Sequence, residues 1–514
     1  MKVSRRRFAK TGSAALVGLS FKGERTMAGS FVNDSFDSGH RLRDRAAFSP
    51  VQRVETFPVV IVGGGIAGLS AAWQLNRRGF KDFVLLEMER EAGGNARSGE
   101  NEVTKYPWAA HYVPAPGPGA TYARELFEEL GALRNGRWDE RYLCFTPQER
   151  LFLHGRWQEG VEPATGLSTA DHDQFRKLDD LLAGFRARGQ FTIPMERGLG
   201  TDAAGLDRIS FSAWLRAQGL DSRPLHWYMN YCCRDDYGAL ASQTSAWAGI
   251  HYFASREHED DGGTLTWPEG NGWIVRQLLQ RVAPFVRTDR MVHRIAQRGR
   301  GYSVLSGTTE YQCEFVIFAA PTFLAPYLVE GIPPLPSFEY SPWLTANLTM
   351  ERLPASADVT WDNVVMESPA LGYVDAMHQS VRTHIGRTVW TFYWALADGS
   401  AAQNRQLLLD QDWRSWKEAI LRDLERVHPD IRACVSRVDI MRMGHAMARP
   451  TVGAIYDPAR RRMAALQGRL LFANSDLSGF SIFEEAQYRG VRAAEHVLGV
   501  VGGSAVLRRP TGLR

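Results

Sequence analysis

A buried strand that runs directly into a glycine-rich turn begins near residue 57. From Phe57 to Leu69 the sequence reads FPVVIVGGGIAGL, which places glycines at Gly63, Gly65 and Gly68. In a strand, turn and helix unit these positions allow a tight turn, close approach of the backbone to a pyrophosphate, and close packing of the helix on the strand. The helix then points free N–H groups and the positive end of its dipole at the phosphates. The pattern therefore predicts an α/β fold with a site for an adenine dinucleotide.

A carboxylate follows the next strand. Residues 83–86 read FVLL, which predicts a short buried strand, and Glu87 comes directly after it. An acid near this distance from the glycines binds a ribose hydroxyl in dinucleotide-binding folds. Strand, helix and acid in this order argue against the alternative, a chance glycine-rich turn in an α/β protein.

The choice between NAD and FAD depends on the residues after Glu87. The sequence GGNARS begins at Gly93. Its glycine pair lets the backbone pass close beneath a cofactor, and Arg97 can meet the charge of a diphosphate. This arrangement resembles the second motif of the flavin-containing amine oxidase superfamily, in which FAD is buried lengthwise. The alternative is an ordinary loop after a strand, helix and strand unit.

The resemblance covers nearly the whole chain after residue 55. The further matching segments are a helix leading to a strand at 273–285, a V-x-x-I strand at 291–295 that closes over the adenine, strands at 302–305 and 313–318 with an Ala-Pro turn, a final strand at 469–472, and a helix at 485–494. The resemblance implies FAD as the cofactor and a two-domain fold. We expect a Rossmann-like FAD-binding domain with a discontinuous α+β substrate domain.

The resemblance also assigns residues to the FAD site. These are Gly63, Gly65, Ile66, Ala67, Gly68, Glu87, Gly94, Asn95, Arg97, Ala110, His111, Val292, Ser475, Asp476 and Phe483.

The last motif departs from the family pattern. The chain reads Ala-Asn-Ser-Asp at 473–476, where the family has Ala-Gly followed by an acid. This variant is more similar to the bacterial spermidine dehydrogenase branch than to monoamine oxidases. Either Ser475 or Asp476 would bind the ribityl hydroxyls, and the sequence leaves both open.

A second departure concerns lysine. Many family members hold a lysine near flavin N5, but the lysines here are Lys2, Lys10, Lys22, Lys81, Lys105, Lys177 and Lys417. None lies where that lysine is expected. The corresponding strand, 344–350, offers Asn347 instead. This departure favours a dehydrogenase that passes electrons to another acceptor, and the acceptor stays open between oxygen and a respiratory carrier.

Aromatic residues are the candidate walls of a substrate site. An amine must be neutral to donate a hydride, and aromatic faces can orient an amino group beside a flavin. We select Trp247 and Tyr252 from an expected helix at 244–253, and Tyr393 and Trp394 from an expected strand at 389–394. The alternative for each residue is a place in the core.

Three polar features are candidates for catalysis or substrate binding. Asp235 and Asp236 follow Arg234 in an expected helix and can anchor the distal ammonium of a polyamine, or they can pair locally with that arginine. An acidic run at 257–261 is a solvated loop or attracts cations to the site. In the segment 443–450, His445 is a candidate base or a structural histidine.

Composition and cysteine usage narrow the class of protein. The 514 residues are 44% hydrophobic and carry a formal net charge of +4, with the basic residues scattered, so we expect no nucleic-acid partner. The cysteines, at 144, 232, 233, 313 and 434, form no C-x-x-C pair and no metal-ligand spacing. The adjacent pair is expected inside a helix rather than bridged. This usage indicates folding in a reducing cytoplasm.

The N-terminus resembles a twin-arginine export signal. Residues 4–10 read SRRRFAK, and a modestly apolar stretch follows at 12–21. That pathway carries folded, cofactor-loaded proteins, so we expect FAD loading in the cytoplasm, export by the twin-arginine machinery and a periplasmic location. The alternative is an uncleaved basic tail. The sequence contains no run of about 18 apolar residues, so we expect no membrane-spanning helix.

The motifs divide the chain into predicted parts. These are a signal and poorly structured linker at 1–54, an FAD-binding domain at 55–115, 265–340 and 465–500, a substrate domain at 116–264 and 341–464, and a tail at 501–514. The predicted function is an exported FAD-dependent oxidoreductase of a polyamine-like amine. The alternatives are a flavin-dependent desaturase or isomerase of an apolar polyene and a catalytically silent flavin-binding protein.

Overall fold

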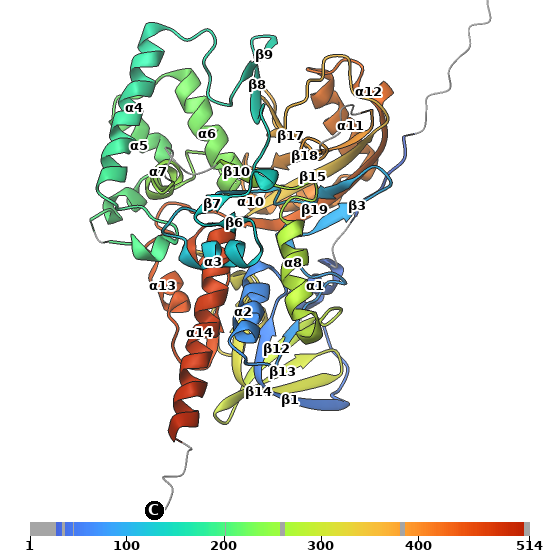
Figure 1. Cartoon of the computed structure of the whole chain (residues 1–514), viewed down its shortest axis with the longest axis vertical. Helices are drawn as coiled ribbons and strands as arrows, with labels where there is room; N and C mark the ends of the chain where they lie inside the picture. The colour runs from blue at the N-terminus through green and yellow to red at the C-terminus, as the bar shows by residue number, and fades with distance from the viewer. Residues whose placement is uncertain are drawn as a thin grey trace, which may run out of the picture.

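Two large sheets, each of seven strands, organise a mixed α/β molecule (Figure 1). The structure is a computed structural model that describes residues 27–32, 36–44, 46–200, 202–256, 263–380 and 386–507. The lower sheet in Figure 1 carries the glycine-rich turn, and the upper sheet lies beyond the carboxyl ends of its parallel strands.

The lower sheet has the order β11-β2-β1-β14-β13-β12, with β20 paired to β14. Its strands are β1 (Arg53–Val62), β2 (Phe83–Leu86), β11 (Val286–Arg287), β12 (Val292–Arg298), β13 (Gly301–Ser306), β14 (Thr309–Phe318) and β20 (Leu470–Phe472). The strands β2, β1, β14 and β20 run parallel. The last four residues of β1 are buried, as an all-apolar run in a parallel strand covered on both faces requires.

Three helices pack against the lower sheet: α2 (Ile66–Arg77), α8 (Gly272–Val282) and α14 (Phe483–Leu507). Their apolar residues join those of β1 and β14 in one core cluster. The sequence predictions of a strand at 83–86, a helix from about 273 and strands at 302–305 and 313–318 are confirmed. α14 continues to Leu507, past the predicted start of the tail at 501, and residues 508–514 lie outside the described residues.

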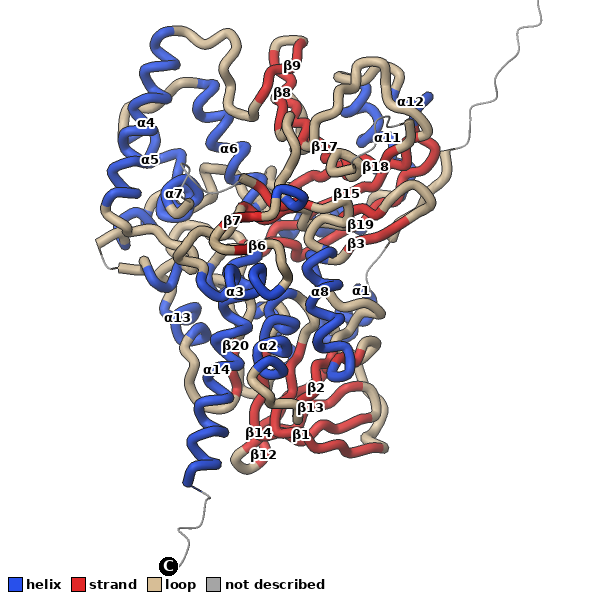
Figure 2. The backbone as a smooth tube through the Cα atoms, viewed as in Figure 1, coloured by secondary structure: helices blue, strands red, loops and turns tan. Residues whose placement is uncertain are grey.

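The upper sheet has the order β19-β15-β18-β17-β16-β8-β9 (Figure 2). Its strands are β8 (Glu149–Leu153), β9 (Arg156–Glu159), β15 (Tyr340–Met350), β16 (Asp362–Val365), β17 (Gly372–Asp375), β18 (Thr388–Ala395) and β19 (Val435–Ala448). Helices α10 (Ala401–Asp410), α11 (Trp413–Glu425) and α12 (Ile431–Cys434) supply apolar residues to one of its faces.

A helical layer lies beside the upper sheet. It contains α4 (Thr169–Ala187), α5 (Phe211–Ala217), α6 (Arg223–Tyr237) and α7 (Ala246–Ala254). Further elements are α3 (Thr121–Glu129), α9 (Ala325–Leu328), α13 (Pro458–Ala464) and the two-stranded pairs β3 (Ser98–Glu100) with β4 (Lys105–Pro107), β5 (Tyr112–Pro114) with β10 (Thr264–Thr266), and β6 (Leu133–Arg134) with β7 (Arg137–Trp138).

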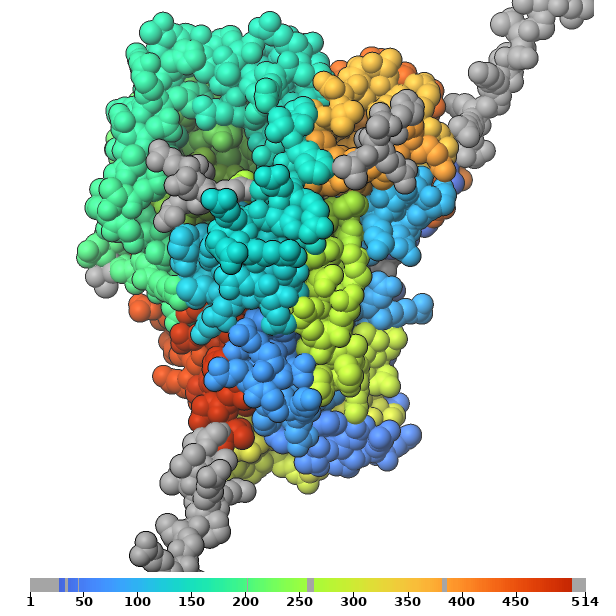
Figure 3. Space-filling view, in the orientation of Figure 1, coloured from blue at the N-terminus to red at the C-terminus, as the bar shows by residue number. Residues whose placement is uncertain are grey.

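Segments that are far apart in the sequence share each half of the molecule. The lower half of Figure 3 combines blue, yellow-green and red surfaces, which are three separate stretches of the chain. In the upper sheet, β8 pairs in parallel with β16, which lies about two hundred residues later. The residue limits of the two domains stay a prediction.

Part of the predicted linker is structured. Ala28 and Phe31 form bridges to Arg437 and Ile440 of β19, and the helix α1 (Phe36–Arg43) follows. β19 is an edge strand of its sheet and offers free backbone groups, and the Arg442 guanidinium lies 3.8 Å from the centre of the Phe31 ring. The expectation of a poorly structured linker is therefore wrong for these residues. The twin-arginine motif lies outside the described residues.

The five cysteines are free, and Cys232 and Cys233 are buried in α6 as predicted. Among the described residues, we find no helix with the length and apolar character needed to span a membrane.

Candidate active site

A cavity of about 470 Å³ is lined by residues of both sheets. It begins at the carboxyl ends of β1 and β2, where Val62, Leu86 and the glycine-rich turn face it, and it reaches Trp343 on β15 and Tyr393 on β18. Open α/β sheets bind ligands at this edge.

The three glycines of the turn have different surroundings. Gly63 has a φ of +103°, and a Cβ there would lie 2.8 Å from Ala320 N. A Cβ on Gly68 would lie 1.9 Å from the Gly63 carbonyl oxygen, so this glycine permits close packing inside the fold and does not line the cavity. Gly65 borders the cavity, and a Cβ on it would meet nothing within 4 Å. The backbone at Gly65 is therefore open to a ligand at the start of α2.

Glu87 lies where the sequence predicts it, at the end of β2 and on the cavity wall. Its carboxylate accepts hydrogen bonds from Gly64 N (2.6 Å) and Glu89 N (2.8 Å). Burial raises the pKa of this carboxyl, and the two N–H donors act in the opposite direction. The carboxylate is held in place for a ligand hydroxyl.

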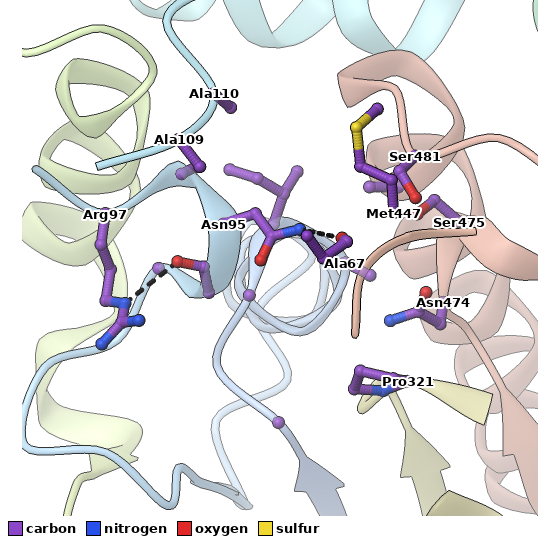
Figure 4. A pocket seen from close by; sticks show the side chains of 18 of the residues that line it. Ala67, Asn95, Arg97, Ala109, Ala110, Pro321, Met447, Asn474, Ser475 and Ser481 are labelled. Atoms are coloured by element: carbon purple, nitrogen blue, oxygen red, sulfur yellow. Dashed lines mark hydrogen bonds between the residues drawn. The ribbon is translucent and has the colours of Figure 1, made fainter. Parts of the chain in front are cut away.

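The second glycine motif lies opposite α2. Gly94 has a φ of +55°, and a Cβ on it would lie 3.3 Å from Gly65 Cα, so the two glycine turns approach each other closely. Asn95 donates a hydrogen bond to the Ala446 carbonyl, and Arg97 Nε donates one to the Gly94 carbonyl at 3.0 Å. Figure 4 shows both side chains beside the cavity.

The variant last motif is explained by its local geometry. The Asn474 side chain accepts a hydrogen bond from Asp476 N and donates one to the Ala319 carbonyl, both at 3.1 Å. It thereby caps the short helical turn that follows. Asn474 and Ser475 line the cavity (Figure 4), whereas Asp476 does not.

Asp476 is therefore a structural residue, and its selection as a ribityl ligand is wrong. Its carboxylate accepts hydrogen bonds from Thr322 N and Thr322 Oγ1, both at 2.6 Å, and from the Tyr340 hydroxyl. Only 1% of Asp476 is exposed. Of the two alternatives left open by the sequence, Ser475 is the residue that lines the cavity.

These features fit an FAD molecule. The cavity offers an open glycine turn at a helix N-terminus for the diphosphate, a held carboxylate for a ribose, and Val292 on the wall beyond it. The residues selected from the sequence that line the cavity are Gly63, Gly65, Ile66, Ala67, Glu87, Gly94, Asn95, Arg97, Ala110, His111, Asp235, Asp236, Val292, Tyr393, His445, Ser475 and Phe483.

Neighbouring aromatic residues on β18 have different roles. Tyr393 lines the cavity, and its hydroxyl donates a hydrogen bond to Asp362 Oδ1 at 2.7 Å. Trp394 lies on the opposite face of the strand and packs edge-on against Trp416, with 5.8 Å between ring centres. The selection of Trp394 is wrong because successive strand residues point to opposite faces of a sheet.

Asn347 is not a site residue either. Its amide donates a hydrogen bond to the Pro107 carbonyl (3.1 Å), and its oxygen accepts one from Thr391 Oγ1 (2.6 Å). Both partners lie within the fold, and Asn347 is 2% exposed. On the same strand Thr345, two residues earlier, lines the cavity. Among the described lysines, none lines it.

His445 lines the cavity and stacks on Phe323, with 4.3 Å between ring centres and 17° between ring planes. The surrounding protein disfavours the charged imidazole, and Arg405 adds to this effect, so the pKa of His445 falls to about 4. The imidazole is neutral at physiological pH. It can accept or donate a hydrogen bond, but a pKa this low makes it a weak base.

Carboxylates surround the substrate end of the cavity. Asp235 and Asp236 at the end of α6 and Glu484 in the first turn of α14 line it. Arg256 Nη2 lies 4.0 Å from Asp236 Oδ2. Arg234 instead donates hydrogen bonds to the carbonyls of Pro369 and Ala370, so the alternative of a local pair with the two aspartates is wrong.

Two aromatic candidates lie away from the main cavity. Trp247 is fully buried and packs against His251 and Phe480, with ring centres 5.1 Å and 6.0 Å away. Its selection as a wall residue is wrong. Tyr252 lines a smaller neighbouring cavity.

Several wall residues had no signal in the sequence. Tyr112, Arg256, Thr345 and Glu484 face the cavity from four different elements or loops. Glu484 follows the last strand motif, and the sequence around it does not indicate that its side chain points into the cavity. Only the register of the two sheets and the docking of α14 bring these side chains together.

Comparison with known proteins is consistent with this site. A sequence model described as "Flavin containing amine oxidoreductase" matches residues 66–498. Amine oxidase [flavin-containing] B of Bos taurus is 25% identical over 290 residues, which is 54% of this chain and 52% of that protein. The probable flavin-containing monoamine oxidase A of Dictyostelium discoideum is 22% identical over 54% of this chain and 58% of its own. The chain thus spans about half the length of these curated relatives.

Solved structures share the fold. Putrescine oxidase with bound putrescine has a TM-score of 0.67 and 17% identity, covering 87% of this chain and all of that one. Cyclohexylamine oxidase from Brevibacterium oxydans has a TM-score of 0.66 and 14% identity, covering 87% and 99%. A fatty acid isomerase from P. acnes has a TM-score of 0.63 and 16% identity, covering 85% and 98%. At these identities the likeness concerns the fold alone.

Proposed function

The chain belongs to the flavin-containing amine oxidoreductases, and on that premise we propose that it oxidises a polyamine-like amine by hydride transfer to its flavin. FAD is the cofactor that this family membership implies. When bound, FAD would supply the hydride acceptor, its N5 atom, for the carbon next to the amine nitrogen.

The acidic character of the substrate end carries the proposal. Asp235, Asp236 and Glu484 face the cavity, and Arg256 is the basic residue beside them. Glu484 is 4% exposed, and its Oε2 atom has no hydrogen-bond partner in the described structure. Buried carboxylates without full compensation attract cations and repel carboxylate ligands. A protonated amine is therefore the matching ligand class.

The remaining side chains position the amine and exclude water. Tyr393 and His111, whose ring centres lie 5.2 Å apart, form an aromatic wall. Burial lowers the pKa of His111 to about 4, so its imidazole adds no positive charge that would repel an amine. The neutral His445 offers a hydrogen-bond partner that likewise carries no charge. The imine product is then hydrolysed by water.

The structure favours amines over the alternative of an apolar polyene. The fold does not separate the two, because a fatty acid isomerase shares it. A polyene would desolvate the carboxylates of Asp235, Asp236 and Glu484 further and offer them no positive charge, which is costly. A catalytically silent flavoprotein is the remaining alternative.

Anaerobic mixing tests the proposal. The purified, FAD-loaded protein is mixed with putrescine, spermidine, butylamine or a carotenoid, and the visible absorption of the flavin is followed. We expect bleaching by the amines. Bleaching by the carotenoid alone supports the polyene alternative, and bleaching by none of them supports the silent flavoprotein.

We also propose that electrons leave to an acceptor other than oxygen. This rests on the absence of a lysine among the described residues that line the cavity. The rate of reoxidation of the amine-reduced protein is compared in air and with a soluble quinone. Faster reoxidation in air would overturn the proposal.

Export by the twin-arginine machinery is a further part of the proposed function. It rests on residues 4–10, SRRRFAK. Replacing Arg5 and Arg6 together by lysine is expected to retain the protein in the cytoplasm. Periplasmic recovery of that double variant in cell fractions would argue against this signal.

A further inference from the structure

A second cavity, of about 60 Å³, adjoins the active-site cavity. Tyr112 and Asp235 line both cavities, so the two spaces share a wall. We call the smaller space the side pocket. Its lining residues are Tyr112, Glu149, Val161, Tyr228, Tyr231, Cys232, Asp235, Tyr252, Trp361 and Asp362.

Two carboxylates of the side pocket come from paired positions on adjacent strands. Glu149 on β8 is the register partner of Asp362 on β16. Residues at paired positions project to the same face of a sheet, a few ångströms apart. Two like charges in this arrangement repel each other unless a cation or a proton neutralises them.

The third carboxylate comes from one face of α6. Tyr228, Tyr231, Cys232 and Asp235 have the spacing i, i+3, i+4 and i+7, which places them in one stripe along a helix. The stripe closes the pocket over the two strands. Asp235 thus joins Glu149 and Asp362 around the same space.

No positive side chain belongs to the described lining of the side pocket. The described structure contains no hydrogen bond or ion pair to the Glu149 carboxylate. Asp362 Oδ1 accepts the Tyr393 hydroxyl at 2.7 Å, and the Tyr112 hydroxyl lies 3.4 Å from Asp235 Oδ2. These neutral hydroxyls bring no positive charge to the three acids when the acids are ionised.

The pKa values of the three acids also indicate that negative charge is unfavourable in the side pocket. Burial, together with Asp236 and Glu149, raises the pKa of Asp235 to about 7. Burial raises the pKa of Asp362 well above its usual value, and Glu149 adds to this; burial also raises the pKa of Glu149. A bound cation would reverse these effects and favour the ionised acids.

The rest of the wall suits an organic cation. Five aromatic rings line the pocket, and Tyr112 and Trp361 meet edge to face with 5.6 Å between ring centres. Aromatic faces attract ammonium groups. Among the described residues, no group of histidine, cysteine or acidic side chains has the arrangement of a metal site.

We propose that the side pocket binds the distal ammonium group of a diamine or polyamine while the reacting amino group lies in the main cavity. The inference rests on the proposed amine oxidation and adds Glu149 and Asp362 as residues that select for a second positive charge. A cavity volume of about 60 Å³ exceeds the roughly 10–15 Å³ that one water molecule needs, so the pocket has room for an ammonium group.

The test compares a diamine with a monoamine of the same chain length. Glu149→Gln removes one charge with little change of shape. Anaerobic flavin reduction is measured over a range of putrescine and butylamine concentrations, which gives an apparent Kd and a limiting rate for each. For putrescine we expect the apparent Kd to rise about tenfold or more, with a limiting rate within about twofold of the wild type. For butylamine we expect no change.

A control variant separates local from general effects. Glu159→Gln removes an exposed carboxylate from the same β8–β9 hairpin and is expected to behave as the wild type. Asp362→Asn is the second pocket variant and is expected to weaken putrescine binding as Glu149→Gln does. Thermal unfolding and the absorption spectrum of bound FAD verify that each variant is folded and loaded.

The outcomes distinguish the pocket from the function. If putrescine reduces the flavin of the wild type and of Glu149→Gln with the same apparent Kd, the pocket assignment is overturned and amine oxidation stands. An equal loss for butylamine indicates a general structural effect and also overturns the assignment. If no amine reduces the wild-type flavin, the proposed function fails and the pocket assignment fails with it.

Discussion

Whether a residue reaches the site depends on the face of the strand that its side chain takes and on its position along that strand. Tyr393 and Trp394 are adjacent in the sequence, yet one faces the cavity and the other packs in a separate core layer. Asn347 is on the correct strand, but Thr345, one strand repeat of about 6.8 Å earlier, reaches the cavity instead. Residue type alone therefore ranks candidates poorly.

The two neighbours on β18 give a residue-scale prediction. Tyr393→Phe removes the hydroxyl that donates to Asp362, which leaves a buried carboxylate oxygen short of a donor. We expect the KM for putrescine to rise by roughly three- to tenfold. Trp394→Phe should leave the KM unchanged and lower the free energy of unfolding in urea by about 1 kcal/mol. A KM shift of similar size in the Trp394 variant would contradict the assigned orientation.

Close contact between elements depends on two glycines. Gly68 on α2 packs against the Gly63 carbonyl, and Gly490 on α14 packs against the Ala67 carbonyl, where an added Cβ would lie 2.0 Å from the oxygen. α14 thus rests on the same helix that presents its N-terminus to the cofactor, and the first turn of α14 supplies Glu484 to the substrate end. The docking of one helix serves both parts of the site.

Gly490 and Gly499 form a matched pair in α14. Gly490→Ala is expected to lower the free energy of unfolding by about 1 to 3 kcal/mol or more, because the backbones must separate. A Cβ on the exposed Gly499 meets nothing within 4 Å, so Gly499→Ala is expected to raise stability by about 0.5 to 1 kcal/mol through helix propensity. Urea denaturation of both variants, with FAD content measured alongside, checks the prediction. Equal effects of the two alanines would rule out close packing at Gly490.

Ionisable groups are buried in several parts of the molecule, and burial shifts their pKa values in two directions. Burial lowers the pKa of His251 to about 3, so the unfolded state binds this proton first as the pH falls below about 6.5. Burial raises the pKa of Asp235 and of Glu484 to about 7, so the folded state keeps these protons at a pH where the unfolded state has lost them. The histidine thus stabilises the fold less as pH falls, and the acids stabilise it less as pH rises towards 7.

The contribution of His251 can be isolated. His251 stacks on Phe480 with 4.6 Å between ring centres, so His251→Phe keeps the packing and removes the titration. Between pH 6 and 4 the wild type is expected to lose about 1.4 kcal/mol of unfolding free energy per pH unit more than this variant. Urea unfolding at several pH values measures the two slopes. Parallel slopes would mean that His251 carries a proton in the folded protein at pH 4.

Local patterns in the sequence determined the cofactor half of this protein. The spacing of Gly63, Gly65 and Gly68, the acid at Glu87 and the pair at Gly93 and Gly94 identified the family and most of the cofactor wall. These features are readable because a strand, a turn and a helix that follow one another in sequence also adjoin in space. In the cofactor half, backbone turns and a helix N-terminus form the binding site, and a short stretch of chain is enough to form each of them.

Only the tertiary structure decided the substrate half. Glu149 and Asp362 become neighbours through the register of β8 with β16, and Asp235 joins them from one face of α6. The face that a side chain takes follows a two-residue repeat in strands and a 3.6-residue repeat in helices. A shift of one residue reverses the face in a strand and turns the side chain by about 100° in a helix. Contacts between such distant segments arise from packing of the whole chain, so no local pattern records them.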